Sequence, residues 1–91
     1  MSGFSWRIIV SPKAGAQLKR LGSVERKRIN RFIDERIRPS NEPEKLGKAL
    51  VGKFLGYWRF RVGDYRIIAK IERNQLIILV LEIAHRSEIC R

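Results

Sequence analysis

A two-residue turn signal, Gly63-Asp64, constrains the fold of this chain more than any other feature, because β-type runs flank it on both sides. Glycine adopts a positive φ without steric penalty, as the first position of a type II′ turn requires, and such turns join neighbouring antiparallel strands. The flanking runs span residues 55–62 and 65–71, and a third run, residues 76–83, follows the weaker turn signal Arg73-Asn74. We therefore predict three antiparallel strands in the C-terminal half.

The N-terminal half is predicted to supply one more strand and two helices. A β-type run, residues 6–10, precedes Ser11-Pro12, which indicates a helix N-cap with proline at the first helical position. Gly22 ends this helix, Ser23 caps the next one, and Arg38-Pro39 ends the second helix. Because so short a connection joins the helices, they are expected to fold back as a hairpin. Their apolar stripes are Ala14, Leu18 and Leu21, then Ile29, Phe32, Ile33 and Ile37.

These elements predict a single α+β domain over residues 1–91, in the order β-α-α-β-β-β. The helical hairpin would pack on one face of a four-stranded, mainly antiparallel sheet. A polar segment, residues 40–52, is expected to cross as a loop, and the tail from Ala84 onward is expected to be irregular. A hydrophobic content of 44% suffices for one modest core, and the single cysteine, Cys90, excludes an intramolecular disulfide.

The register of the predicted hairpin decides which side chains share a face of the sheet. With Gly63-Asp64 as the loop, Arg61 pairs with Arg66, and alternate residues point to opposite faces. The face expected to receive the helices carries Trp58, Phe60, Val62, Tyr65 and Ile67. The other face carries Tyr57, Arg59, Arg61, Arg66 and Lys70, and the same register continued across the next turn adds Ile77, Leu79 and Leu81.

The basic face agrees with the charge of the whole chain. Twenty Lys and Arg against nine Asp and Glu leave a formal net charge of +11, for which nucleic acid is the commonest partner. A solvated basic surface and an acidic protein partner are the alternatives. Guanidinium groups offer a planar set of donors for phosphate oxygens and can stabilise the charge that develops in phosphoryl transfer. The aliphatic residues beside them are unlike an ordinary solvent surface and indicate a protein partner.

The sequence lacks most of the usual catalytic sets. Its only histidine, His85, excludes a two-histidine nuclease site. One histidine and one cysteine near Glu82 and Glu88 are a weak metal signal, so no metal and no cofactor are expected. His85, placed just beyond the last strand, could carry a proton near neutral pH, although a histidine there is as often a polar cap. Arg86 is the better candidate for a phosphate ligand.

We expect a reduced cytoplasmic protein that makes no contact with a membrane. The N-terminal residues lack the pattern of a signal peptide, and the longest apolar run, residues 76–81, is much shorter than the roughly 20 residues that span a bilayer.

Four segments together resemble the RelE branch of the RelE/ParE toxin superfamily. They are the strand start Val-Gly-Asp-Tyr-Arg-Ile-Ile at residues 62–68, the tail Ala-His-Arg-Ser-Glu-Ile at residues 84–89, the Leu-Val-Gly at residues 50–52 and the Trp-Arg-Phe-Arg at residues 58–61. The predicted element order also resembles that branch, and the resemblance covers nearly the whole chain.

The resemblance implies the toxin of a type II toxin–antitoxin pair, which enters the ribosomal A site and cuts messenger RNA there without a metal. In such toxins the 2′-hydroxyl of the RNA attacks the adjacent phosphate, and a cognate antitoxin holds the activity in check. The partners implied are therefore mRNA, the ribosome and an antitoxin. Carried over by position, the candidate catalytic residues are Arg66, Arg86, Arg61, His85 and Cys90, and the candidate RNA-binding residues are Arg59, Arg61, Tyr57 and Lys70.

The chain departs from the family pattern at Cys90. RelE-like toxins usually carry a tyrosine near this end, where it stacks on a base and assists proton transfer. A thiol cannot stack in this way, and with an unperturbed pKa of about 8.5 it is mostly neutral. Two alternatives to an active ribonuclease therefore stay open. One is a ParE-like inhibitor of DNA gyrase that performs no chemistry, and the other is an RNA-binding module with weak or no cleavage.

Overall fold

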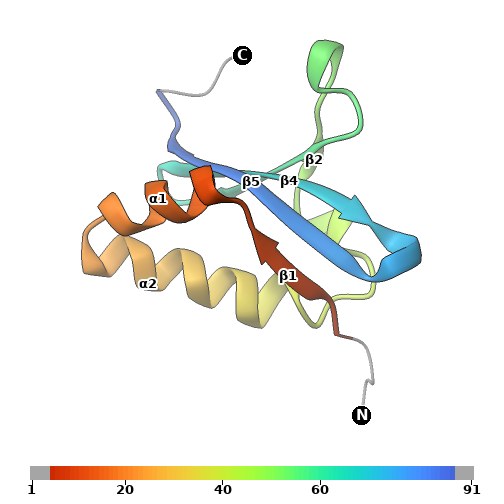
Figure 1. The fold of residues 1–91 in the computed structure, drawn as a ribbon, viewed down its shortest axis with the longest axis horizontal. Helices are drawn as coiled ribbons and strands as arrows, with labels where there is room; N and C mark the ends of the chain where they lie inside the picture. The colour runs from red at the N-terminus through yellow and green to blue at the C-terminus, as the bar shows by residue number, and fades with distance from the viewer. Residues whose placement is uncertain (1–4, 88–91) are drawn as a thin grey trace.

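The computed structural model describes residues 5–87, which form two helices packed on one face of a mixed five-stranded sheet (Figure 1). The expected α+β class and the position of the helical hairpin are confirmed, while the sheet has one strand more than predicted. The elements in chain order are β1 (Arg7–Val10), α1 (Pro12–Arg20), α2 (Ser23–Phe32), η1 (Ile33–Ile37), η2 (Pro43–Leu46), β2 (Lys48–Ala49), η3 (Gly52–Phe54), β3 (Trp58–Val62), β4 (Tyr65–Glu72), η4 (Arg73–Gln75) and β5 (Ile77–His85).

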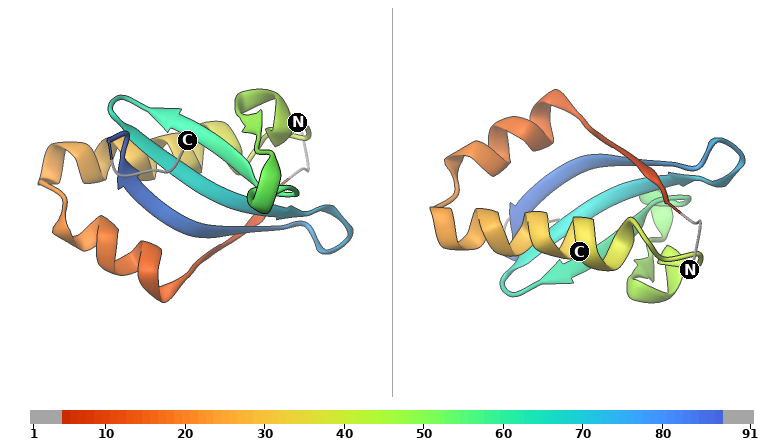
Figure 2. Two further views of the ribbon diagram at one scale, coloured as in Figure 1. Left: turned by 90° about the horizontal axis from the view of Figure 1, so that it is seen from above. Right: turned by 90° about the horizontal axis from the view of Figure 1, so that it is seen from below.

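The strands lie in the order β1-β5-β4-β3-β2, with β1 parallel to β5 and the other pairs antiparallel. Helix α2 crosses one face of this sheet, and α1 lies beside α2 at the edge of β5, as the two views of Figure 2 show. We call the uncovered side the open face. The loop that carries η3 stands on the side of the open face (Figure 1). Residues 55–57, which we predicted to begin β3, belong to this loop, because Gly56 adopts a positive φ of 98°.

The additional strand is β2, inside the segment that we predicted to be a loop. It pairs Lys48 with Arg59 and Ala49 with Trp58. Gly47 leads the chain into this strand so closely against β3 that a Cβ atom there would lie 2.5 Å from the carbonyl oxygen of Arg59. Only a residue without a side chain fits such an approach. The prediction of a plain crossing loop was therefore wrong at its C-terminal end.

Both helices begin and end close to the predicted residues. The Ser11 hydroxyl accepts a hydrogen bond from the Ala14 amide at 3.0 Å, which confirms Ser11 as the N-cap of α1. The cap of α2 was wrongly assigned, since Gly22 is the N-cap and Ser23 is the first helical residue. Beyond Phe32 the helix continues as the π-helical turn η1. No helix within residues 5–87 combines the length and the apolar content that crossing a membrane requires.

The core lies between the helices and the covered face of the sheet. The predicted inward residues of the hairpin are there, with Phe60 and Ile67 fully buried and Trp58, Val62 and Tyr65 partly buried against the core. The helical segments contribute Ala14, Ile29, Ile33 and Ile37 to the core, and β5 contributes Ile78, Val80 and Ile83. This inward set confirms the register predicted across the Gly63-Asp64 turn, including the Arg61–Arg66 pair on the open face.

A β-bulge divides the ladder between β4 and β5. Ala69 pairs with Val80 and Ile68 pairs with Glu82, so Leu81 is an extra residue without a partner in the ladder. Ile77 and Leu79 keep the predicted open side. Beyond the bulge Glu82 and Ala84 stand opposite Ile68 and Arg66. The tail also starts later than predicted, because β5 extends to His85.

Candidate nucleic-acid interface

Four arginines converge at one end of the open face, and we call them the arginine cluster: Arg59, Arg61, Arg66 and Arg86. Strand β3 presents Arg59 and Arg61, and β4 presents Arg66 directly opposite Arg61. Within residues 5–87, no carboxylate lies within 4.0 Å of the side chains of Arg59, Arg61 or Arg66. The positive charge of these three strand residues is thus left for a ligand to neutralise.

Arg66 occupies the centre of this charge. Its pKa is lowered from the ordinary value, first because partial burial disfavours the charged form, and then because the guanidinium groups of Arg61, Arg59 and Arg86 repel it. An arginine nevertheless stays protonated at neutral pH, because its ordinary pKa lies far above neutrality. The mutual repulsion of these groups would fall when a phosphate binds among them, which is the electrostatic condition for an anion site.

Arg86 joins the cluster from the first position after β5, where no strand ladder holds it. Its amide donates a hydrogen bond of 2.8 Å to the carbonyl oxygen of Asp64 in the β3–β4 turn. Its Nε atom also lies 3.8 Å from Asp64 Oδ1. The C-terminal end of β5 is therefore fastened to the tip of the β3–β4 hairpin, and this contact brings Arg86 beside Arg66.

His85 lies on the other face of the sheet. It pairs with Tyr65, whose ring it meets edge-on at a centroid distance of 5.5 Å. Its Nδ1 atom accepts a hydrogen bond from the Ser87 amide at 3.2 Å and lies 3.0 Å from the Ser87 hydroxyl oxygen. The structure therefore does not bring His85 together with the arginine cluster, although adjacency in sequence to Arg86 suggested a common site.

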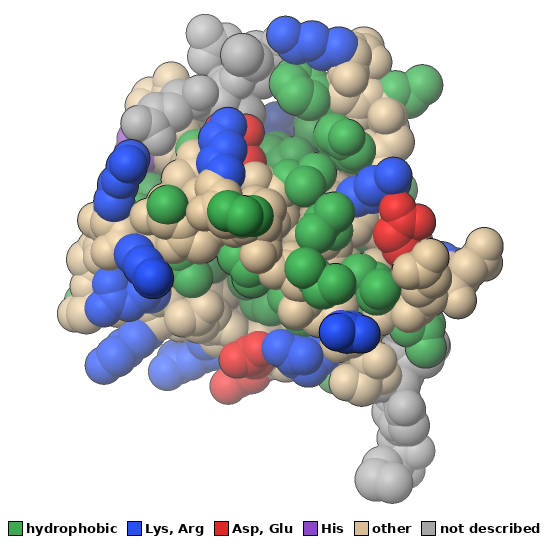
Figure 3. All heavy atoms as spheres, viewed as in Figure 1, with side chains coloured by type: hydrophobic (Ala, Val, Ile, Leu, Met, Phe, Trp, Pro, Cys, Tyr) green, Lys and Arg blue, Asp and Glu red, His purple; other side chains and the backbone are tan. Residues whose placement is uncertain are grey.

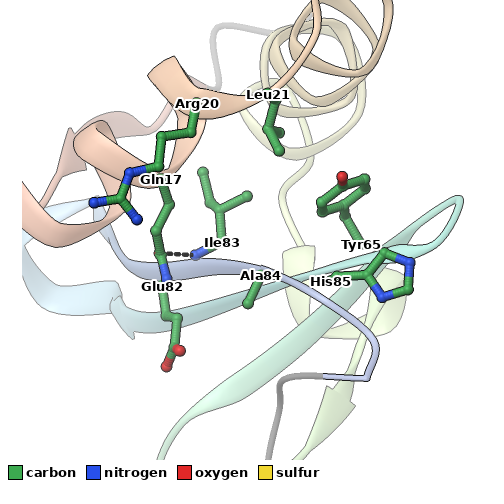
Figure 4. Close-up of a pocket in the computed structure, with 8 residues that line it drawn as sticks. All are labelled: Gln17, Arg20, Leu21, Tyr65, Glu82, Ile83, Ala84 and His85. Carbon is green, nitrogen blue, oxygen red and sulfur yellow. Dashed lines mark hydrogen bonds between the residues drawn. The ribbon is translucent and has the colours of Figure 1, made fainter.

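The side chains of His85 and Tyr65 line a pocket beside α1 (Figure 4). Leu21 and Arg20 bound it from the helical side, and Figure 4 shows Gln17 reaching down to β5. There the Gln17 Oε1 atom accepts a hydrogen bond of 2.7 Å from the Ile83 amide. This contact satisfies the edge of β5 beyond the point where β1 ends. We therefore interpret the pocket wall as part of the packing between α1 and the sheet.

The remaining candidate residues, Lys70, Tyr57 and Cys90, do not all lie on the open face of the described structure. Lys70 lies on the open face, where Glu72 at 3.1 Å raises its pKa by hydrogen bonding and by charge attraction. Tyr57 precedes β3 and is close enough to Lys70 to influence that pKa. Cys90 falls outside the described residues. Among residues 5–87, no three His, Cys, Asp or Glu side chains gather in a way that could hold a metal ion.

One basic residue escaped the sequence analysis. Lys48 pairs with Arg59 across β2 and β3, so it extends the basic surface by one strand. The alternation of Lys48 with the apolar Ala49 was the available signal, but two residues are too few to predict a strand.

Aliphatic side chains continue the open face away from the cluster. Ile9 of β1 pairs with Leu79 of β5, and Ile9 is 37% exposed. Figure 3, which has the view of Figure 1 with β1 and α1 in front, shows hydrophobic side chains gathered in the middle of that side of the molecule, with Lys and Arg side chains around them. The open face is thus basic toward β3 and apolar toward β1.

Comparisons with known proteins identify the family and the fold. Residues 8–90 match the family model described as ParE toxin of type II toxin–antitoxin system, parDE. Toxin RelG of Mycobacterium tuberculosis is 33% identical over 52 residues, which are 57% of this chain and 60% of the length of that toxin. The chain thus spans less than two thirds of that relative.

Two solved structures share the fold. The toxin–antitoxin complex RelBE2 from Mycobacterium tuberculosis superimposes with a TM-score of 0.81 at 23% identity, covering 90% of this chain and 99% of that one. The archaeal RelE–RelB complex from Pyrococcus horikoshii gives a TM-score of 0.75 at 22% identity, with 94% and 100% coverage. Together with the family match over most of its length, this likeness shows that the chain belongs to the RelE/ParE superfamily of type II toxins.

Proposed function

We propose that this toxin is a metal-independent endoribonuclease that cuts mRNA in the ribosomal A site and so inhibits translation. The observation that supports this function most directly is the arginine cluster on the open face. Its three strand members have no carboxylate within 4.0 Å among the described residues. An inhibitor that acts only by binding a protein does not need guanidinium groups concentrated against one another, whereas a site for a phosphorane does.

The proposed reaction is an internal transesterification of the RNA. The 2′-oxygen attacks the adjacent phosphorus, the bond from phosphorus to the 5′-oxygen breaks, and the products carry a 2′,3′-cyclic phosphate and a 5′-hydroxyl. Arg61, Arg66 and Arg86 would stabilise the additional negative charge on the phosphorane. Arg59, with Tyr57 and Lys70, would hold the flanking RNA.

The 2′-hydroxyl proton must pass to a base and a proton must reach the 5′-oxygen. His85 and Cys90 are the candidates that the sequence offers for these transfers. Since His85 shares its face with Tyr65, it could take part only by reaching around the end of the sheet. We therefore assign the larger share of the catalysis to electrostatic stabilisation by the arginines.

We also propose that a cognate antitoxin covers the open face. Acidic side chains of such a partner would neutralise the arginine cluster, and its apolar side chains would bury Ile9, Ile77 and Leu79. Both toxins named above for their fold were solved together with antitoxins, which supports a partner of this class.

A second candidate function is inhibition of DNA gyrase without chemistry. The matching family model is described as that of ParE toxins, which favours this function. The replacement of the usual tyrosine by Cys90 favours it as well. The arginine cluster remains unexplained under this alternative.

A reconstituted translation reaction and a DNA supercoiling assay with gyrase together test the two candidates. We expect cleavage of the mRNA at the A-site codon, with products that end in a 2′,3′-cyclic phosphate, while supercoiling by DNA gyrase stays normal. Intact mRNA together with stalled gyrase would overturn the proposal. The Cys90→Tyr variant should cleave faster than the native chain if the missing ring limits the rate.

A further inference from the structure

The β3–β4 turn places a carboxylate at the arginine cluster. Among the described residues 5–87, Asp64 is the only acidic residue that shifts the pKa of Arg66, and it raises that pKa where the three neighbouring arginines lower it. A negative charge at this position weakens the attraction of the surface for RNA phosphate. Its presence beside a site built from cations therefore requires a separate explanation.

The turn itself does not require a carboxylate. Gly63 supplies the positive φ of 61°, while Asp64 is not among the residues of positive φ. A type II′ turn with glycine first accepts asparagine or serine at its second position as readily as aspartate. The charge of Asp64 is therefore separable from the geometry of the turn.

The carboxylate of Asp64 could hold the side chain of Arg86 in place. Arg86 follows the last residue of β5, its side chain is 60% exposed, and the like charge of Arg66 repels it. Against that repulsion stand two contacts, both with Asp64. One is the 2.8 Å backbone hydrogen bond, and the other is the 3.8 Å approach of the carboxylate to the Arg86 Nε atom.

We propose that Asp64 is a positioning residue whose carboxylate holds the Arg86 guanidinium in the arginine cluster, against the repulsion of Arg66. The backbone hydrogen bond places the Cα atom of Arg86, and the carboxylate then selects the direction of its side chain. This inference rests on the proposed function, because the purpose of the arrangement is to present Arg86 to the reacting phosphate.

The first test replaces Asp64 by Asn, which keeps the turn and removes the charge. The cleavage rate at saturating ribosomes should fall about fivefold, the upper size expected of an exposed ion pair. The half-saturating concentration should stay the same or decrease, since a negative charge has been removed from a surface that binds a polyanion. An unchanged maximal rate would overturn the inference.

Glu82→Gln is the matched control. Glu82 is also an acidic residue of the open face, but its partner is Lys13 of α1 at a distance of 3.5 Å. Removing its charge should leave the maximal rate unchanged. An equal loss in both variants would show that net charge, and not the contact with Arg86, sets the rate, and the inference would fall.

A double-mutant cycle separates positioning from direct action. In the Arg86→Ala background, Asp64→Asn should have no further effect on the maximal rate, because the group that it positions is gone. A fivefold loss in that background would overturn the inference.

A readout without cleavage distinguishes this inference from the proposed function. The ¹⁵N-edited NMR signal of the Arg86 Nε–H group should shift in Asp64→Asn and stay in place in Glu82→Gln. If the native toxin cleaves no mRNA, the proposed function fails, and this signal alone decides the inference. An Nε–H signal that is the same in Asp64→Asn and in the native toxin would then overturn it.

Discussion

The two antiparallel ladders that β4 makes, with β3 on one side and with β5 on the other, differ in regularity. Every residue of β3 faces one residue of β4, from Val62–Tyr65 at the turn to Trp58–Ala69. The ladder with β5 contains an extra residue, Leu81, and the sides of the residues beyond it are exchanged. A tight turn thus transmits its register along one ladder, whereas a bulge interrupts that register in the other.

The difference decides which side chains reach the candidate site. The regular ladder places Arg59, Arg61 and Arg66 together on the open face. In the other ladder an unbroken alternation from Ile77 and Leu79 would have turned His85 to that face, and the bulge turns it to the helices instead. The same bulge turns the next residue, Arg86, to the open face, where it joins the cluster. A single added residue therefore exchanges a candidate base for a candidate phosphate ligand.

The largest effect should come from the regular ladder. Arg66→Ala removes the central charge of the cluster, and the cleavage rate in the reconstituted reaction should fall about 100-fold or more, as when a donor to a developing oxyanion is lost. The melting temperature should hardly change, because the residue lies outside the core. Lys27→Ala, which removes an exposed cation from α2, is the control. Normal cleavage by Arg66→Ala would refute our placement of the site.

Gly47→Ala should disturb the same ladder from its outer side. The added Cβ would meet the Arg59 carbonyl oxygen at 2.5 Å and the Phe60 ring at 2.9 Å. We expect a loss of about 1–3 kcal/mol in the free energy of unfolding, measured by urea denaturation. In Gly15→Ala the new Cβ has as its nearest neighbour Val10 at 3.9 Å, so this change in α1 should stabilise the protein by about 0.5–1 kcal/mol. Equal effects in the two variants would contradict the close approach.

Arg86→Ala tests the bulged ladder. Since the side chain is 60% exposed, it is expected to contribute less than Arg66, and the cleavage rate should fall about tenfold. Arg86→Lys should recover part of the rate, because a point charge replaces some of the electrostatic stabilisation but not the planar donor geometry. A loss greater than that of Arg66→Ala would place the centre of the site nearer to the tail.

His85→Ala should have the smallest effect on cleavage, within about twofold, because a residue that touches no reacting atom contributes little beyond general surface terms. Its edge contact with Tyr65 should contribute about 0.5–1.5 kcal/mol to stability, which thermal unfolding would register. A loss of cleavage as large as that of Arg86→Ala, together with an altered pH profile, would show that His85 reaches the reacting phosphate.

Much of the fold was predictable because its signals are local. Ser11-Pro12, the apolar spacing of the helices and Gly63-Asp64 each act within a few residues, and the structure confirms all three. The failures involve partners distant in the chain. Strand β2 is two residues long and exists only because β3 lies beside it, so no periodicity could reveal it.

The sequence alone determined the α+β class and the face on which Arg59, Arg61 and Arg66 lie, since alternation along a strand and one glycine turn suffice for both. The tertiary structure decided the bulge. The run from Leu76 to Leu81 is uniformly apolar and contains no signal of an extra residue. At the bulge the Ser11 amide donates to the Val80 carbonyl at 2.9 Å, and the Ser11 hydroxyl donates to the Leu81 carbonyl at 3.0 Å. These two carbonyl groups do not bond to β4, and Ser11, about 70 positions earlier in the chain, satisfies both of them. Only the folded chain brings Ser11 to this place.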